Sequence, residues 1–478
     1  MTTVSSGPAS ATARRGFDSL EEELQLERLG VRGELPDWLQ GMLLRTGPAK
    51  WEVGERVMEH WFDGLAMLHR FSFAGGEVSY ANRFLETGAW RAARERGRIE
   101  YSEFATDPCR SLFQRVTALF SPQLTDNANV NLARLGKRFI SMTETPIPVQ
   151  FDAETLAAAG VPYKPPGQLT TAHPHVDRGT AGMLNYAARL GPRSSYRFFH
   201  LGPDANAPDV VATLPVREPA YMHSFGVTSR WFVLAEFPLV VNPLRLALGG
   251  RPYIENYRWK PELGTRFHLF DRRTGGHRGP FATDARFAFH HVNAYDDGTE
   301  VVADICTFAD DAIVKDLYLE RLRAGKPVEK PRLERFRIAP DAGTVQCEQL
   351  IDEPLELPRI NYTRCNERPY QYIWGVGTAG AWLDRIVKAD AVQRTSAVWS
   401  EHGCFPGEPV FVAAPQATEE DEGVLLSIVL DSQKGNSSLL VLDARNLKEL
   451  ARAEVPHHIP FGFHGQFARD SQPTPKAN

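Results

Sequence analysis

Four histidines occupy similar surroundings in stretches that lie far apart along the chain. Each follows small or aromatic residues and stands near a proline or glycine that could end a strand. They are His173, His223, His290 and His464, separated by 50, 67 and 174 residues, and no pair has the local spacing of a metal finger. Any one of them is best explained as a core histidine with a single hydrogen bond. Four neutral imidazoles brought together without a carboxylate would instead suit iron, copper or zinc.

One of these histidines is followed directly by another, in the run FAFHHVNAYDDG that contains His290 and His291. Adjacent residues of a regular strand point to opposite faces of the sheet. At most one of the two imidazoles is therefore expected to face the interior.

Three glutamates stand in stretches as apolar as those around the histidines, each with a proline close by: Glu144 in ISMTETPIPV, Glu356 in PLELPRIN and Glu408 in FPGEPVFV. Each one alone is at least as well explained as a strand-end residue that faces solvent. A buried and ionised carboxylate needs a partner, because an unpaired buried charge is costly. A metal-bound imidazole supplies such a partner, since it usually donates its second N–H to an acceptor behind it.

The elements that would have to position these residues are mainly strands. Short β-branched or aromatic runs such as RWFVLAEFPLVV, EVVADICTF and GVLLSIVLD are bounded by turn residues. A strand followed by Asp and a short polar loop recurs in FDAETL, FDRRTG and LDARNL. Such repeats predict an all-β fold, a β-propeller whose strand ends converge on one axis, although a large sandwich or two all-β domains would look similar. Helical signals are few, in 18–30 and 311–325.

The composition excludes several classes of protein. The net charge of −5 shows no basic excess, so we expect no nucleic-acid partner. The five cysteines include no CxxC pair, which indicates reduced thiols and no disulfide framework. We find neither a secretory signal nor an apolar run long enough to span a bilayer, and we expect a cytoplasmic protein. A single domain is predicted over 16–468, between polar tails at 1–15 and 469–478 that we expect to be disordered.

A series of longer motifs then follows in a consistent order: HWFDGLAMLHRFSF, TDNANVNL, TETPIPVQFDAETL, TAHPHVD, PAYMHSFGVT, FHHVNAYDDG, LPRIN, GEPVFV, DEGVLLSIVLD and PFGFHGQF. Through these motifs the chain, from about residue 35 to its last histidines, resembles the carotenoid cleavage oxygenases. These are non-haem iron enzymes that split polyene double bonds.

The resemblance implies a seven-bladed β-propeller with a cap of helices and loops over the iron-bearing face. It implies that Fe(II) is bound by His173, His223, His290 and His464. The second shell would be Glu144 behind His223, Glu356 behind His290 and Glu408 behind His464, with no glutamate behind His173. One small departure is Asp296, where the family often has glutamate.

The resemblance also implies a dioxygenase reaction. Open positions on the iron would bind O2 next to an electron-rich alkene, and both oxygen atoms would end in two carbonyl products. The protein would contribute positioning and shape and no acid or base. Val130 matches a position close to the open iron site and would shape access to it, although it could equally be core.

The substrate is inferred from which branch of the family the motifs match. Thr143 stands where the stilbene-cleaving branch has a lysine that handles a phenolic proton, which argues against that branch. The N-terminal half is similar to the animal branch, and we expect central 15,15′ cleavage of β-carotene to retinal, with eccentric 9,10-type or apocarotenoid cleavage as the alternative. Tunnel positions match residues that could equally pack a core: Phe62, Phe104, Thr143, Tyr221 and Phe463.

The segment 236–253, EFPLVVNPLRLALGGRPY, concentrates leucine and valine between prolines and glycines. In the family such a segment belongs to an apolar patch at the tunnel mouth. Exposed apolar patches mark interaction sites, and we expect a peripheral contact with the inner face of a membrane. A buried blade or a dimer contact would give the same sequence pattern.

Three rival functions share parts of this pattern. A retinoid isomerase would use the same iron site without consuming O2. A propeller that only binds an apolar ligand would not need seven residues suited to a metal shell. A zinc hydrolase would want an adjacent general base, and the three glutamates are already assigned behind the histidines.

Overall fold

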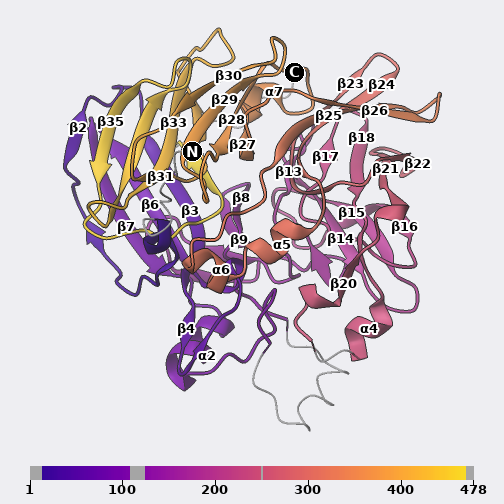
Figure 1. The fold of residues 1–478 in the computed structure, drawn as a ribbon, viewed down its shortest axis with the longest axis horizontal. Helices are drawn as coiled ribbons and strands as arrows, with labels where there is room; N and C mark the ends of the chain where they lie inside the picture. The colour runs from indigo at the N-terminus through magenta and orange to yellow at the C-terminus, as the bar shows by residue number, and fades with distance from the viewer. Residues whose placement is uncertain (1–12, 108–123, 249–250, 470–478) are drawn as a thin grey trace, which may run out of the picture.

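Seven antiparallel sheets of four to six strands form the blades of a β-propeller (Figure 1). The computed structural model describes residues 13–107, 124–248 and 251–469. The predicted all-β, seven-bladed fold is confirmed. Residues 1–12 and 470–478 of the two predicted tails lie outside the described residues, whereas Ala13–Phe17 form a 3-10 helix, η1.

The first three blades are built as follows. Blade 1 contains β1 (Gln25–Leu26), β7 (Glu77–Phe84), β6 (Leu65–Ala74), β3 (Gly41–Lys50) and β36 (Gly465–Ala468). Blade 2 contains β8 (Asn131–Leu135), β9 (Arg138–Met142), β10 (Val149–Phe151) and β11 (Ala158–Gly160). Blade 3 contains β12 (Leu169–Thr170), β13 (His175–Val176), β14 (Met183–Arg189), β15 (Ser195–Leu201) and β16 (Asp209–Pro215).

The next three blades have four strands each. Blade 4 contains β17 (Gly226–Val227), β18 (Trp231–Glu236), β21 (Thr265–Asp271) and β22 (His277–Thr283). Blade 5 contains β23 (Phe287–Asp297), β24 (Glu300–Phe308), β25 (Arg332–Ala339) and β26 (Thr344–Gln349). Blade 6 contains β27 (Glu356–Arg359), β28 (Tyr372–Gly377), β29 (Arg385–Asp390) and β30 (Thr395–Trp399).

The seventh blade draws strands from both ends of the chain. It contains β31 (Cys404–Pro406), β32 (Val410–Ala413), β33 (Gly423–Asp431), β34 (Asn436–Asp443), β35 (Glu449–Glu454) and, at its edge, β2 (Val31–Gly33). Middle strands of the blades are buried on both faces, as in β24 and β33. This burial explains why their sequences are nearly continuous apolar runs.

The chain ends close the ring of blades by completing the first one. The C-terminal β36 pairs antiparallel with β3, with Met42 opposite Ala468 and Arg45 opposite Gly465. A Cβ atom on Gly47 would lie 2.9 Å from the Cα atom of Gly462, so the two chain segments approach as closely as glycine allows. On the basis of this closure we propose that 16–468 form one domain.

Short helices and two small hairpins cover one end of the propeller (Figure 1). The helices are α2 (Gly88–Arg96), α4 (Pro243–Leu248), α5 (Ala312–Asp316) and α6 (Leu319–Arg323), with 3-10 turns η2 (Trp61–Asp63), η3 (Ile254–Asn256) and η4 (Pro261–Leu263). The short helix α7 (Tyr362–Cys365) lies at the opposite end (Figure 1). The hairpins are β4 (Glu52–Val53) with β5 (Arg56–Val57), and β19 (Leu239–Val241) with β20 (Tyr257–Trp259).

Of the two helix signals in the sequence, one is confirmed and the other is wrong. The helix signal over 311–325 is confirmed by α5 and α6. The acidic segment 18–30 is not helical, because Gln25 and Leu26 instead pair with Ala81 and Tyr80 of β7. Among the described residues, no helix is both long and apolar enough to cross a bilayer.

Two aromatic rings join blade 6 to blade 7. Trp374 in β28 is fully buried, stacks on Phe411 in β32 at 4.6 Å between ring centroids, and donates its indole N–H to the carbonyl of Ala444 at 3.1 Å. Truncation of a buried tryptophan typically costs about 3–5 kcal/mol. We expect Trp374→Ala to lower the free energy of unfolding by this amount in urea titrations. Val392→Ala, at a site 67% exposed, should leave it unchanged, and equal effects of the two variants would contradict the assignment.

Candidate metal centre

The four histidines singled out in the sequence meet at one point, and their candidate ligand nitrogens all lie within 4.8 Å of one another. The Nε2 atoms of His173 and His223 are 3.0 Å apart, and those of His290 and His464 are 3.1 Å apart. Two nitrogens at right angles about an ion, each about 2.1 Å from it, would be separated by about 3.0 Å. The spacing of the four imidazoles therefore fits a single transition-metal ion.

The propeller brings these residues together because each lies in or directly beside an edge strand of its sheet. His173 stands between β12 and β13, His223 precedes β17, His290 lies in β23, and His464 immediately precedes β36. The β23–β24 register shifts on both sides of His291, and such irregularities can re-aim a side chain. His290 joins the cluster, whereas the Nδ1 atom of His291 hydrogen-bonds Ser224 at 2.9 Å.

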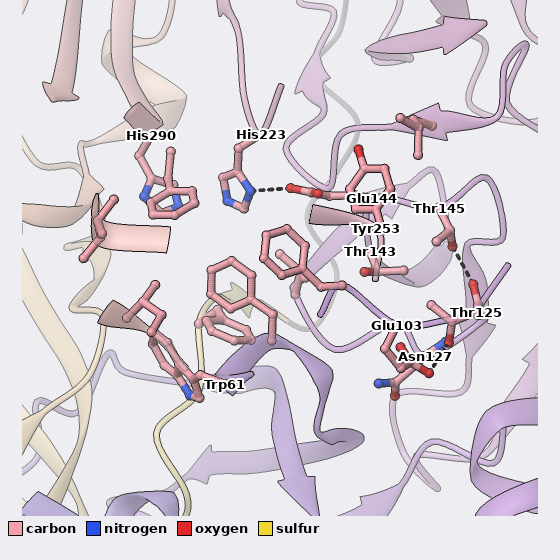
Figure 2. A pocket seen from close by; sticks show the side chains of 18 of the residues that line it. Trp61, Glu103, Thr125, Asn127, Thr143, Glu144, Thr145, His223, Tyr253 and His290 are labelled. Atoms are coloured by element: carbon pink, nitrogen blue, oxygen red, sulfur yellow. Dashed lines mark hydrogen bonds and ion pairs between the residues drawn. The ribbon is translucent and has the colours of Figure 1, made fainter. Parts of the chain in front are cut away.

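Three of the imidazoles donate from their outer nitrogen to a glutamate, and the partners are those that the family resemblance implies. The Nδ1 atoms of His223, His290 and His464 lie 2.6, 2.6 and 2.7 Å from carboxylate oxygens of Glu144, Glu356 and Glu408, respectively. Figure 2 shows the first of these contacts. Donation from Nδ1 fixes the tautomer and leaves the Nε2 lone pair directed toward the centre.

The fourth imidazole, that of His173, has no glutamate behind it among the described residues. Burial, together with the nearby His464 and His223, lowers the pKa of His173 well below its usual value. Burial also lowers the pKa of His464 to about 4, although Glu408 opposes the shift. Both imidazoles are therefore neutral at physiological pH, which is the protonation state that a metal ligand needs.

The environments of the three glutamates differ. Glu144 accepts a second hydrogen bond from the hydroxyl of Tyr221, at 2.6 Å. Glu408 is fully buried and accepts from the backbone N–H of Gly465 at 2.9 Å. Guanidinium atoms of Arg45 and Arg359 lie 3.6 and 3.5 Å from its carboxylate. Burial alone would raise the pKa of Glu408, but Arg359, His464 and Arg45 outweigh it and lower the pKa to about 2.

A cavity of about 540 Å³ lies beside the histidines and is lined mainly by apolar side chains. The predicted tunnel residues that line it are Phe62, Phe104, Val130, Thr143 and Phe463. The ring of Phe62 touches those of Phe104 and Phe463, at centroid distances of 5.1 and 5.2 Å. Aromatic walls of this kind suit a flat apolar ligand.

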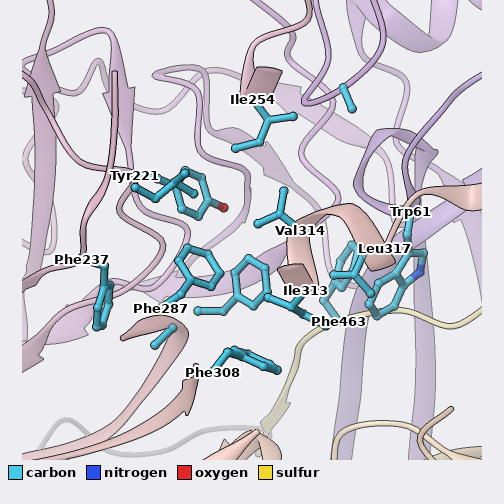
Figure 3. Packing of buried hydrophobic residues seen from close by; sticks show 14 of the residues in the cluster. Trp61, Tyr221, Phe237, Ile254, Phe287, Phe308, Ile313, Val314, Leu317 and Phe463 are labelled. Atoms are coloured by element: carbon cyan, nitrogen blue, oxygen red, sulfur yellow. The ribbon is translucent and has the colours of Figure 1, made fainter. Parts of the chain in front are cut away.

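The side chains of α5 complete the cavity on its cap side. Ile313 of α5 and Leu317, which directly follows α5, line it and pack with Trp61 and Phe463 (Figure 3). The helix signal at 311–325 therefore predicted an element of the cavity wall, although nothing in the sequence indicated which face it covers.

Two sequence expectations need correction at this site. Tyr221 was expected to contact substrate, but it is not among the residues that line the cavity, because its hydroxyl is directed to Glu144. The second expectation is an exposed apolar patch over 236–253, which would include Leu239, Val240 and Val241. They are buried in β19, and among the described side chains of the segment Leu244 is the large apolar one that is exposed, at 63%.

Several residues of the site escaped the sequence analysis. Arg45 and Arg359 are charged residues that the fold buries against Glu408, and Phe289 and Trp382 are aromatic residues of the cavity wall. The motif LPRIN contains Arg359 three positions after Glu356, which was an available signal. Phe289 directly precedes His290 in the run FAFHHVNAYDDG, which was a second signal. Nothing local distinguishes Arg45 or Trp382.

The comparisons with known proteins agree on one family. The family model described as "Retinal pigment epithelial membrane protein" matches residues 17–469. The human carotenoid-cleaving dioxygenase, mitochondrial, is 34% identical, with 98% of this chain and 90% of the relative covered. The human beta,beta-carotene 15,15′-dioxygenase is 32% identical, with 94% of this chain and 93% of the relative covered.

Solved structures give the same result for the fold. A mutant of the Synechocystis apocarotenoid oxygenase is 26% identical and superposes with a TM-score of 0.87, covering 96% of this chain and 99% of that one. A cobalt-substituted form of the Synechocystis protein superposes with a TM-score of 0.85, at the same identity and coverage.

The hydrogen bond between Glu144 and His223 gives a test of metal binding. Outer-shell partners of ligand histidines typically contribute 10–100-fold to metal affinity. We expect Glu144→Gln, which keeps the shape of the side chain but removes its charge, to weaken Co(II) binding by about that factor in calorimetric titrations of metal-free protein. Tyr221→Phe is the matched control, since it removes only the other hydrogen bond to Glu144 and should have a smaller effect. Unchanged affinity in Glu144→Gln would contradict the assignment.

Proposed function

Since this chain belongs to the retinal pigment epithelial membrane protein family, the carotenoid cleavage oxygenases, and is a carotenoid cleavage dioxygenase, we propose that it uses Fe(II) and O2 to split a carotenoid double bond into two carbonyl groups. The observation that carries the proposal is the placement of four inward-facing imidazoles beside an apolar cavity. The substrate would supply the two alkene carbons, and O2 would supply both carbonyl oxygens.

The residues assigned to the iron are His173, His223, His290 and His464, with Glu144, Glu356 and Glu408 holding three of them. An all-imidazole set is suited to iron and leaves the charge of the ion uncompensated by its direct ligands. The chemistry that bound Fe(II) supplies is the activation of O2 next to an electron-rich alkene. The glutamates keep each Nδ1 proton in place, so that the Nε2 lone pairs stay available.

The cavity residues would hold and shield the polyene. The rings of Phe62, Phe104 and Phe463 would pack against its flat conjugated system and exclude water from the reacting bond. Val130 is buried and lines the cavity, where its methyl groups would restrict access to the open side of the metal. Thr143 lines the same cavity but offers no amine to a phenolic proton, which argues against a hydroxylated stilbene as substrate.

We favour central 15,15′ cleavage of β-carotene to retinal. Support comes from the β,β-carotene 15,15′-dioxygenases among the relatives, such as the human one. Eccentric 9,10-type cleavage or apocarotenoid cleavage is the alternative, and it is favoured by the likeness to carotenoid-cleaving dioxygenases and to the Synechocystis apocarotenoid oxygenase. A propeller that only binds an apolar ligand would have no use for three histidine–glutamate pairs.

The deciding experiment is aerobic incubation of the Fe(II)-loaded protein with detergent-solubilised β-carotene, with products identified by chromatography and mass spectrometry. We expect retinal, and no product from a His290→Ala protein or from an anaerobic sample. A longer apocarotenal with an ionone would keep the enzyme class and replace the central position by an eccentric one. Product formation by His290→Ala at the wild-type rate would contradict the metal assignment.

We also propose that the protein is cytoplasmic and meets a membrane surface through α4. Leu244 is exposed, and its neighbours Pro243 and Leu246 line the cavity, so an apolar substrate entering there would pass from lipid to the aromatic walls. Arg245 is also exposed and could reach lipid headgroups.

Removal of this apolar side chain gives the test. Burying a leucine contributes about 1.5–3 kcal/mol, so we expect Leu244→Asp to lower the fraction of protein bound to phospholipid vesicles by about tenfold in flotation assays. Val392→Asp is the matched control, since Val392 is 67% exposed on the β29–β30 turn and should bind as the wild type does. Equal binding by all three proteins would rule out α4 as the contact.

A further inference from the structure

A second, smaller cavity lies between blades 1 and 7, apart from the one beside the histidine cluster. It has a volume of about 30 Å³ and is lined by residues of β3, β6 and β33 and of the segment before β36. Arg45 and His69 line it, and each is only 5% exposed. The cavity is therefore bordered by a buried cation and a buried imidazole.

Arg45 and His69 are direct neighbours in blade 1. They lie opposite each other in the antiparallel pair β3–β6, so their side chains share one face of the sheet, with Cβ atoms about 5 Å apart. On the other side of β3, Arg45 lies opposite Gly465, where a Cβ atom would be 2.6 Å from Arg45 Cγ. The missing side chain makes room for the guanidinium, which contacts Glu408 and the carbonyl of Phe463. The register therefore places His69 next to the arginine that contacts Glu408.

A chain of hydrogen bonds leads from His69 toward the protein surface. His69 Nδ1 lies 2.9 Å from the hydroxyl of Tyr80, and this hydroxyl lies 3.0 Å from His457 Nε2. His457 Nδ1 lies 3.4 Å from a carboxylate oxygen of Glu22, whose side chain is 61% exposed. Four side chains therefore connect the small cavity with solvent.

Both imidazoles of the chain are neutral at physiological pH. Burial, together with the nearby His457 and Arg45, lowers the pKa of His69 to about 3. Burial also lowers the pKa of His457, although Glu22 opposes the shift. A neutral imidazole has one N–H donor and one lone-pair acceptor, so each ring can donate at one end of the chain and accept at the other.

The carboxylate at the exposed end fixes the direction of these hydrogen bonds. A carboxylate only accepts, so His457 donates from Nδ1 to Glu22 and accepts at Nε2. Tyr80 has one hydroxyl proton, which it donates to His457. The oxygen of Tyr80 then accepts from the Nδ1–H of His69. The Nε2 atom of His69 is consequently a lone-pair acceptor, and among the described residues it forms no hydrogen bond.

Arg45 supplies the complementary donors. It donates to the carbonyls of Glu408 and Phe463 at 3.2 and 3.0 Å, and a guanidinium has five N–H donors, so further donors remain for the cavity. A buried water needs about 10–15 Å³ and at least two polar partners. Water can donate to His69 and accept from Arg45. An anion would face the lone pair of His69, and an apolar molecule would leave both groups unpaired.

We propose that the small cavity between blades 1 and 7 is a binding site for ordered water, which donates to His69 Nε2 and accepts from Arg45. His69 and Tyr80 are then positioning residues. Through the water they hold the guanidinium against Glu408, and through Glu408 they hold the imidazole of His464. The inference goes beyond the proposed cleavage reaction and rests on it only in the assignment of His464 to the metal.

Nitrogen-15 NMR of the histidine rings in the metal-free protein tests the direction of the chain. We expect both His69 and His457 to carry their proton on Nδ1, with His69→Gln and His457→Gln used to assign the signals. A proton on Nε2 of His69 would overturn the proposal, because two donors would then face the cavity.

A high-resolution crystal structure of the metal-free protein tests the water itself. We expect a water oxygen within about 3.2 Å of both His69 Nε2 and the guanidinium of Arg45. Crystals grown with bromide distinguish an anion from water by its anomalous scattering. A bromide ion at this position, or no bound molecule between the two side chains, would overturn the proposal.

Metal binding tests the positioning role. An outer-shell partner typically contributes 10–100-fold to metal affinity, and His69 is one step further from the ion. We therefore expect His69→Phe to weaken Co(II) binding by about threefold to tenfold in calorimetric titrations and to shift the visible absorption bands of bound Co(II). His69→Gln, whose amide oxygen can accept from the water, should restore most of the affinity. Tyr80→Phe, which removes a single oxygen atom, should give a smaller loss.

His458→Phe is the matched control, because His458 is 4% exposed but donates to the carbonyl of Asp18, outside the chain. It should bind Co(II) as the wild type does. Wild-type affinity in His69→Phe, or an equal loss in His458→Phe, would overturn the positioning role.

The NMR and crystallographic results do not depend on the cleavage reaction. Bound water and Nδ1 protons without turnover of any carotenoid would refute the cleavage reaction and leave the water site standing. Carotenoid turnover by a protein that holds no water between Arg45 and His69 would do the reverse.

Discussion

The pairing of β36 with β3 is the interaction on which the rest of the molecule depends. It joins the last strand of the chain to the first blade and completes the ring. His464 immediately precedes β36, and Arg45, opposite Gly465 in the register, contacts both Glu408 and the carbonyl of Phe463. The same few residues therefore close the fold and fix the fourth imidazole, so that fold and site form together.

The three histidine–glutamate pairs share one geometry but differ in charge balance. Glu408 is stabilised as an anion by two arginines, whereas Glu144 has the neutral hydroxyl of Tyr221 as its second partner. Since Coulomb interactions are strong in a buried site, the negative charge behind His464 is largely compensated. The charge behind His223 is not, so the imidazole of His223 is the more strongly polarised of the two toward its inner nitrogen.

Site residues could be predicted from the sequence where their immediate neighbours in the chain indicate a buried environment. Each histidine of the cluster follows small or aromatic residues, and each glutamate stands in an apolar run. The propeller then brings them together across steps of 50, 67 and 174 residues between successive histidines. Residues whose role arises only from distant partners were missed. Arg45 contacts Glu408 and Phe463, which lie 363 and 418 positions away in the sequence. No local sequence pattern predicts such a contact.

The errors have the same origin. The leucine and valine residues of β19 look like an exposed apolar patch in sequence, yet pairing with β20 buries them. The acidic segment 18–30 has helix-forming residues, but β7 offers its edge as a partner. In both cases tertiary pairing overrides local propensity.

The closure of the ring by β36 has a consequence for biosynthesis. A ribosome synthesises the chain from its N-terminus, so the edge of β3 that pairs with β36 stays unpaired until β36 has been made. Unpaired strand edges can pair with the wrong strand. His173, His223 and His290 are synthesised well before His464. A chain that stops before β36 therefore lacks both the strand that closes the propeller and the fourth imidazole of the candidate metal centre.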